Sequence, residues 1–183
     1  MGGMSSHSIE RIREEHGIRE HTIPIEELYE KFGVDPDVGH TIEDAHARYE
    51  EDGPNKLCPH EDPRISYPTD YTCLVLREGE KHTILVEELV LGDIVEMNEG
   101  DVVPADIRII EAENFMVNVC EFTMEIEPKV KSPNCTSENP IESENLCFMS
   151  TVVVEGWSKG IVYAIGDNTL AGQLLPHRTI EGE

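Results

Sequence analysis

Five cysteines and eight histidines are the side chains best suited to redox or metal chemistry, and their spacing favours neither. The cysteines occupy positions 58, 73, 120, 135 and 147, and no two of them form a Cys-x-x-Cys pair. No two histidines have the spacing that puts both metal ligands on one face of a helix. We therefore expect reduced thiols, several of them buried on strands, and neither a metal nor a cofactor.

The chain is strongly acidic, with 38 Asp and Glu against 14 Lys and Arg and a formal net charge of −24 over 183 residues. This balance argues against nucleic acid and against anionic membrane surfaces as partners. Because the acidic residues are spread along the chain, we interpret them first as a solvated surface. A basic partner protein is the more specific alternative.

No segment approaches the ~20 consecutive apolar residues that a membrane-spanning helix needs. The first residues lead into a charged stretch and lack the apolar core of a signal peptide. We therefore predict a cytoplasmic chain with no membrane span of its own, which could reach a membrane through a partner.

Composition divides the chain into a β-rich region and a helical segment, joined by a linker and flanked by tails. The predicted parts are a flexible tail (1–20), a helical segment (21–57), a Pro-rich linker (58–70), a β domain (71–176) and a second tail (177–183).

The helical segment predicts two short amphipathic helices. The first is capped by Thr22 and ends at Gly33, and the second runs from a cap at Thr41 to Gly53. Their expected apolar faces are Ile25, Leu28, Tyr29 and Phe32 in the first helix, and Ile42, Ala45 and Tyr49 in the second. Because short helices are not stable alone, we expect both to dock on the β domain.

From Tyr71 the apolar pattern alternates with a period of two, which is typical of strands. Short strands at this spacing predict a mainly β fold with minor helix content, either a distorted jelly roll or a small barrel. The expected strands are 72–77, 82–86, 92–97, 106–111, 115–121, 146–154 and 159–165, with a closing helix over 167–175.

Two motifs make the reading of the β domain more specific. Leu-Val-Leu-Gly-Asp-Ile-Val ends at Val95, and Gly-Asp-Val-Val-Pro-Ala-Asp-Ile-Arg ends at Arg108. This order resembles the actuator domain of P-type cation pumps. Upstream, Ile25 to Leu28 and Glu51 to Leu57 resemble the cytoplasmic N-terminal segment of the Na+/K+ pump α subunit, so the likeness covers roughly residues 21 to 175.

The resemblance also shows what this sequence lacks. In the family, two membrane-spanning helices separate the N-terminal segment from the actuator domain, whereas here a polar, Pro-rich stretch from Pro59 to Tyr71 joins them. No Asp-Lys-Thr-Gly-Thr phosphorylation sequence is present. We therefore expect neither ATP hydrolysis nor cation transport by this chain alone.

The resemblance implies a catalytic loop that reads Thr-Gly-Glu-Ser-Glu-Pro, whose first glutamate positions the water that attacks an aspartyl-phosphate. The matching residues here are Thr123, Met124, Glu125, Ile126, Glu127 and Pro128. Methionine replaces the glycine that allows close approach of the phosphoryl group, and isoleucine replaces the serine hydroxyl. We expect this degenerate loop to be non-catalytic.

Three functions remain open on the sequence. The chain could be a non-catalytic relative of the pump's actuator domain that acts through protein contacts, with other domains or subunits of a cation pump as partners. It could instead present Glu125 in trans to a pump's aspartyl-phosphate. It could also be a truncated pump product with no activity of its own.

Overall fold

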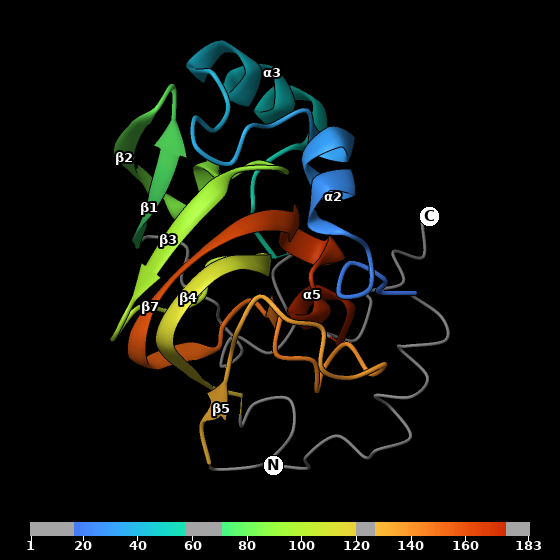
Figure 1. Ribbon diagram of the computed structural model, residues 1–183. Helices are drawn as coiled ribbons and strands as arrows, with labels where there is room; N and C mark the ends of the chain where they lie inside the picture. Colours follow the sequence, from blue (N-terminus) through green and yellow to red (C-terminus); the bar gives the residue numbers. More distant parts are fainter. Residues whose placement is uncertain (1–16, 58–70, 120–126, 175–183) are drawn as a thin grey trace, which may run out of the picture.

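The fold is built on one antiparallel sheet of seven strands (Figure 1), and the computed structural model describes residues 17–57, 71–119 and 127–174. In chain order the strands are β1 Thr72–Arg77, β2 Glu80–Leu85, β3 Ile94–Asn98, β4 Asp106–Asn118, β5 Lys129–Val130, β6 Leu146–Cys147 and β7 Val152–Ala164. The hydrogen-bonded order is β2-β1-β3-β7-β4-β5, with β6 paired to β4. The predicted mainly β, actuator-like fold is therefore confirmed, as a sheet that is not closed into a barrel.

Strands β4 and β7 are longer than the sequence predicted, because each continues through a residue pattern that looked like a break. Each has 13 residues, and the two pair along most of their length. The β4–β7 ladder has four register shifts, and at one of them, between Glu113 and Met116, Asn114 adopts a φ of 48°. Gly156 opposes this register shift, and a Cβ there would lie 2.3 Å from the Asn114 carbonyl oxygen.

The first N-terminal helix, α2 (Ile25–Phe32), carries its apolar face onto the sheet. Leu28 and Phe32 are buried, and Gly33 ends the helix in the left-handed conformation, as predicted. The prediction that Thr22 caps this helix is wrong. The Thr22 hydroxyl donates to the Arg19 carbonyl at 2.9 Å, and Pro24 is the residue that precedes the helix.

The second helix, α3 (Ile42–Asp52), begins at the predicted cap, since the Thr41 side chain accepts the Asp44 N–H at 3.0 Å. Its predicted inner face is only partly right. Ala45 is buried, but Ile42 is 46% exposed and Tyr49 is half-buried. A hydrogen bond from Arg48 to the Phe32 carbonyl, at 2.6 Å, links this helix to α2 instead.

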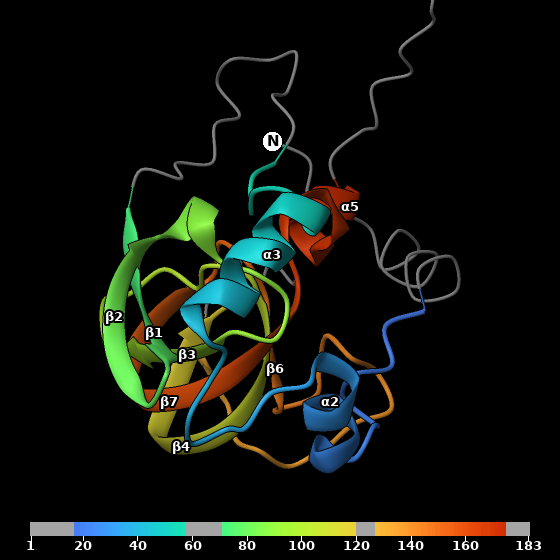
Figure 2. The same ribbon diagram turned by 90° about the horizontal axis from the view of Figure 1, so that it is seen from above.

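Three short helical turns complete the fold. They are the 3-10 turns Val86–Glu88 and Gly166–Asn168 and the closing helix α5 (Leu170–Leu174). Figure 2 shows α2 on the opposite side of the molecule from the β1–β2 hairpin. The predicted tails and linker lie almost wholly outside the described residues.

Two apolar clusters hold these parts together. One joins α2 and α5 to the face of the sheet that carries Ile94 and Ile161, and the other fills the opposite face around Phe115 and Met97. The docking of α2 on the β domain is thus observed, whereas neither cluster includes a residue of α3, whose buried residue is Ala45.

Polar contacts fix the same junction. Gly92 has a φ of 86°, and a Cβ there would lie 2.6 Å from His40 Nε2 and 2.8 Å from Phe32 Cβ. His40 Nε2 lies 3.1 Å from the Leu91 carbonyl oxygen, and His21 Nε2 lies 3.0 Å from that of Glu138. The N-terminal segment therefore meets the β domain at several separate points.

Candidate functional site

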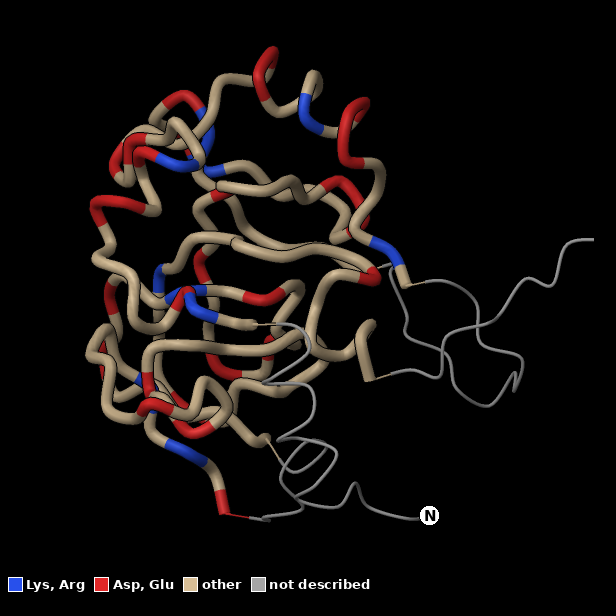
Figure 3. The backbone as a smooth tube through the Cα atoms, turned by 90° about the vertical axis from the view of Figure 1, so that its right-hand side faces the viewer, with Lys and Arg blue, Asp and Glu red and all other residues tan. Residues whose placement is uncertain are grey.

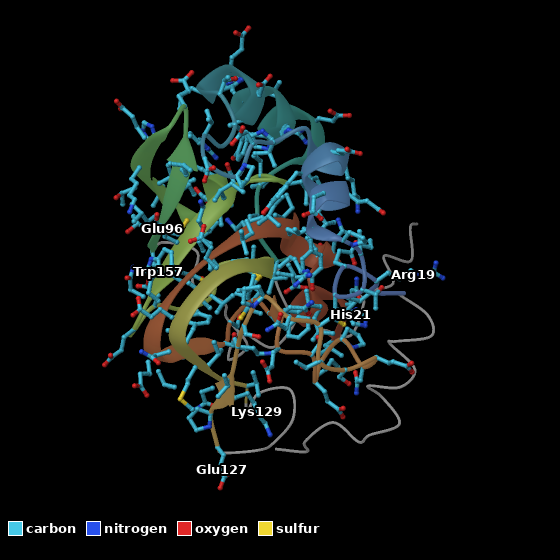
Figure 4. The ribbon with its side chains drawn as sticks, viewed as in Figure 1. Arg19, His21, Glu96, Glu127, Lys129 and Trp157 are labelled. Atoms are coloured by element: carbon cyan, nitrogen blue, oxygen red, sulfur yellow. The ribbon has the colours of Figure 1, made fainter. Side chains whose placement is uncertain are left out.

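The loop that matches the family's catalytic sequence lies between β4 and β5. The two strands pair through Met116↔Val130 and Val117↔Lys129, so both ends of the loop are held at one edge of the sheet. Figure 4 shows Glu127 and Lys129 at that end of the molecule, away from the N-terminal helices.

Of the six predicted loop residues, Thr123, Met124, Glu125 and Ile126 lie outside the described residues. Glu127 and Pro128 are described, and both are exposed. The structure therefore fixes where the loop begins and returns, and the geometry around Glu125 remains a prediction.

Buried residues at the end of β4 and just after it hold the base of the loop. Phe115, Val117 and Val119 are each at most 3% exposed, and the Lys131 N–H donates to the Phe115 carbonyl at 2.9 Å. The Lys131 ammonium is buried and donates to the Ser143 carbonyl at 3.0 Å. Burial lowers the pKa of this amine, because the charged form loses its hydration.

The first family motif places an ion pair inside the sheet. Arg77 on β1 donates to both carboxylate oxygens of Asp93, from Nε at 3.0 Å and from a terminal nitrogen at 2.6 Å. Asp93 also accepts the Val90 N–H at 3.0 Å, and Arg77 donates to the Glu88 carbonyl. The Asp93 side chain is fully buried, so this motif aspartate closes the turn before β3 and is not open to a substrate.

The second motif places Asp106 at the start of β4, where it joins three segments. One carboxylate oxygen accepts the Met149 N–H at 2.9 Å, and the other accepts the Leu170 N–H at 2.7 Å. Burial raises the pKa of this carboxyl to about 7, although the two hydrogen bonds act in the opposite direction. At 1% exposure it is inaccessible, so we assign it a structural role despite its perturbed pKa.

The Gly-Pro-Asn sequence that ends the helical segment supplies a third buried joint. The Asn55 amide donates to the carbonyls of Val86 and Pro104, and its oxygen accepts the Gly166 N–H at 2.9 Å. Its main-chain N–H donates to the Glu87 carbonyl. One fully buried side chain thus ties the N-terminal segment to both the middle and the end of the β domain.

The cysteines match the prediction only in part: Cys147 is buried on β6, Cys73 is half-buried on β1 and Cys135 is exposed. Cys73, Cys135 and Cys147 are free, and burial raises the pKa of Cys73 to about 12 and that of Cys147 to about 11. Such thiols are poor nucleophiles near neutral pH. Over the three described ranges, no group of three or more His, Cys, Asp or Glu residues is placed to hold a metal ion.

The acidic surface has no single focus. Figure 3 shows Asp and Glu distributed over the whole described backbone, with few Lys and Arg among them. Within the same residues, no helix is long and apolar enough to cross a bilayer.

The motif placement of the loop stays a prediction, and the sequence analysis missed Asp93, Asp106 and Asn55 as buried, hydrogen-bonded residues. For Asp93 and Asp106 the available signal was a charged residue inside an otherwise apolar stretch, since such a residue is buried only when it is hydrogen-bonded. Asn55 lies in a polar stretch, and its sequence contains no such signal.

Comparison with known proteins agrees with this architecture. The P-type ATPase actuator domain family matches residues 69–177. Sodium/potassium-transporting ATPase subunit alpha-B of Artemia franciscana is 31% identical over 240 residues, which include 91% of this chain and 24% of that protein. Subunit alpha of Drosophila melanogaster is 53% identical over 100 residues, or 55% of this chain and 10% of that protein. The human subunit alpha-2 is 52% identical over 101 residues, again 55% of this chain and 10% of that protein.

The chain spans 24% of the first of these relatives and 10% of each of the other two. The Artemia alignment is longer than this chain of 183 residues, so the relative carries residues within the matched region that have no counterpart here. On the match over residues 69–177 and on the fold, the chain belongs to the P-type ATPase actuator domain family.

Proposed function

We propose that this protein is a non-catalytic actuator module of the Na+/K+-ATPase α-subunit type, which acts in the cytoplasm through protein contacts. One observation carries the proposal. The chain has the fold of an actuator domain, with Asp93 and Asp106 buried and hydrogen-bonded, while its catalytic-loop sequence departs from the family pattern at two of six positions.

The two departures remove what the chemistry needs from those positions. Glycine lets the backbone come close to a phosphoryl group, and methionine at 124 adds a long side chain in that space. Isoleucine at 126 has no hydroxyl with which to donate a hydrogen bond. Glu125 keeps its carboxylate, but without close approach it cannot bring a water within hydrogen-bond reach of an aspartyl-phosphate.

The partners that fit best are other cytoplasmic domains or subunits of a cation pump. In the family, the actuator domain works against the phosphorylated domain of the same chain. A separate module of this fold could engage that same domain in trans. We expect no ATP hydrolysis and no ion transport by this chain itself.

An in-trans catalytic role for Glu125 is the alternative from the enzyme class, and exchanging the loop tests it. Residues Thr123 to Pro128 replace the corresponding loop in an intact Na+/K+-ATPase, and phosphoenzyme decay is followed after a chase. We expect the phosphoenzyme to form but to decay slowly. Reverting Met124→Gly and Ile126→Ser in the graft should restore decay. Decay at the normal rate in the unreverted graft would instead support catalysis through Glu125.

A binding measurement separates a functional module from an inactive truncated product. Purified protein is titrated against a purified Na+/K+-ATPase, and complex formation is measured by sedimentation. Saturable binding at one site supports the proposal. Absence of binding, together with rapid degradation of the protein in cells, would favour the truncated product.

A further inference from the structure

A groove of about 880 Å³ opens in the sheet between β1 and β3, on the side that carries the β1–β2 hairpin. Its walls come from the first half of β1, from the end of β3 with the turn after it, and from the segment that leads into β7. Figure 4 shows one lining residue, Glu96, at the left of the molecule, well separated from the loop end at Glu127. The groove is therefore distinct from the degenerate loop.

The groove exists because two neighbouring strands separate. Strands β1 and β3 pair only as far as Leu74↔Glu96, although β1 continues along β2 to Thr72 and β3 continues along β7 to Asn98. The two kinds of residue pair alternate along an antiparallel ladder, so the next pair of the same kind as Leu74↔Glu96 would be Thr72 and Asn98. Asn98 is instead engaged by Asp101, whose carboxylate accepts the Asn98 N–H at 2.8 Å and whose N–H donates to the Asn98 carbonyl at 3.0 Å.

This turn leaves a strand edge open inside the sheet. At Thr72, β1 has β2 on one side and, within the described chain, no paired strand on the other. An open edge offers main-chain donors and acceptors to any extended segment that lies alongside it. Edge pairing of this kind is a common way for a domain to bind a peptide.

The residues that line the groove indicate which kind of segment could bind there. Its floor is apolar, with Val95, Met97, Pro104 and Met149 buried, and Val102 and Val152 stand exposed at its rim. Among the described lining residues, the charged side chains are Glu96 and Asp101, and none is basic. Glu96 pairs with Lys81 at 2.8 Å, whereas Asp101 has no basic partner in the described chain.

We propose that this groove binds an extended segment of a partner protein, in which apolar residues alternate with Lys or Arg, as an added strand at the edge of β1. Alternate apolar side chains would face the floor, and the basic ones would lie against Asp101 and the acidic surface around it. The net charge of −24 makes a basic partner more favourable than a second copy of this chain, which would bring the same charge. This inference rests on the proposed function, because it names a surface for the protein contacts suggested there.

Three nine-residue peptides with a fluorescent label test the groove in about 0.15 M salt, where distant charges are screened. The first is Lys-Val-Arg-Val-Lys-Val-Arg-Val-Lys, the second has Glu at every basic position, and the third repeats the first with N-methylated valines. We expect saturable anisotropy with the first peptide and none with the second. N-methylation removes main-chain donors and should weaken binding by about tenfold or more.

A matched pair of variants locates the binding. Val152 lines the groove and is 40% exposed, while Val154 lies on the same strand outside the groove and is 37% exposed. Val152→Lys places a cation at the rim and should weaken the basic peptide by about tenfold. Val154→Lys makes the same change in net charge and should alter binding by less than about twofold. Asp101→Asn keeps an oxygen for the Asn98 N–H and should weaken binding by about threefold.

Several results would overturn the inference. Equal binding of the basic and N-methylated peptides, or equal loss in the two lysine variants, would mean non-specific charge attraction. No saturable binding would mean that the groove does not accept such a segment, for example because residues 58–70 of the same chain occupy it. A dimer that Val152→Lys dissociates would make a second copy the occupant. If the whole protein still binds a pump while the peptides fail, only this inference is refuted and the proposed function stands.

Discussion

The two motif regions of this protein differ in how deeply the fold depends on them. In the stretch from Glu87 to Asp106, two of the three motif aspartates, Asp93 and Asp106, are at most 1% exposed, and each has several hydrogen-bond partners, whereas Asp101 lies exposed in the turn after β3. In the loop from Thr123 to Pro128, the two residues that the structure describes are both exposed, and the loop connects a strand to a two-residue edge strand.

This difference explains how the chain can keep an actuator scaffold while its loop differs. Replacing a buried, paired carboxylate leaves its partners without hydrogen bonds, so changes there reduce the stability of the whole domain. Substitutions in an exposed loop do not reduce stability in this way, so function is the main constraint on its residues. Likeness to the family therefore supports the fold of this protein more strongly than it supports the family's catalytic step.

Asp93→Ala should have the largest effect, and it tests whether the fold depends on the buried aspartates of the stretch from Glu87 to Asp106. It leaves the Arg77 guanidinium, whose side chain is 10% exposed, without its carboxylate, and it removes the acceptor of the Val90 N–H. Breaking a buried ion pair on one side costs about 3–5 kcal/mol. Urea unfolding followed by circular dichroism should show a loss of this size.

A more exposed ion pair, between β2 and β3, provides the control. Glu96 pairs with Lys81 at 2.8 Å, but the Lys81 side chain is 59% exposed. Glu96→Gln should therefore cost less than about 1 kcal/mol. Similar losses in the two variants would contradict the claim that burial makes the Asp93 pair structural.

The next largest effect concerns the docking of α2. Phe32→Ala removes a ring that is 5% exposed and packs on the sheet, so it should cost about 2–4 kcal/mol. Ile42→Ala on α3 removes a side chain that is 46% exposed and should cost less than about 0.5 kcal/mol. Equal unfolding midpoints for these two variants would mean that the N-terminal helices do not stabilise the β domain in solution.

Local features of the fold could be predicted from the sequence, because they depend on residues close together in the chain. Strand β1 has the predicted bounds, and the Thr41 cap and the Gly33 stop are where the pattern placed them. The side-chain period also identified Leu28 and Phe32 as buried.

The buried hydrogen bonds of Asn55 and Asp106 could not be predicted, because the residues that they join lie far apart in the sequence. Asn55 binds Gly166 across 111 positions, and Asp106 binds Leu170 across 64. The exposed position of Ile42 has a similar cause, since which face of α3 is covered depends on where α2 and the β1–β2 turn lie. For the candidate site, the motif placement of the loop stays a prediction, and the sequence contained no sign that β1 and β3 separate.

A smaller effect should appear in the pH dependence of the same junction. Burial lowers the pKa of His40 below its usual 6.5, as does nearby Arg48, while the Leu91 carbonyl, Asp93 and Asp44 act in the opposite direction. The folded state therefore favours the neutral ring, and the contribution of His40 to stability should fall as the pH drops below about 6.5, because the unfolded chain binds the proton more readily. Asp106, whose pKa is raised to about 7, contributes in the opposite direction, so the effect of His40 is the difference between the parent protein and a His40 variant. The slope cannot exceed about 1.4 kcal/mol per pH unit for one group.

Urea midpoints measured at pH 7.5 and pH 5.5 check this sign. His40→Gln removes the titrating group, so the variant should lose less stability on acidification than the parent protein does. Any remaining pH dependence in the variant belongs to other groups. An identical slope in both proteins would mean that His40 takes up its proton in the folded state as easily as in the unfolded chain.

The smallest expected effect lies at the loop. Glu127 is exposed and follows directly on the undescribed part of the loop, so Glu127→Gln should change the free energy of unfolding by no more than about 0.5 kcal/mol. Asp93→Ala and Glu127→Gln each remove one negative charge, and their losses in free energy of unfolding should differ by several kcal/mol if the comparison is right. A loss at Glu127 as large as that at Asp93 would show that the loop packs against the scaffold. The altered loop sequence would then reflect packing against the scaffold, and function would not be the main constraint on its residues.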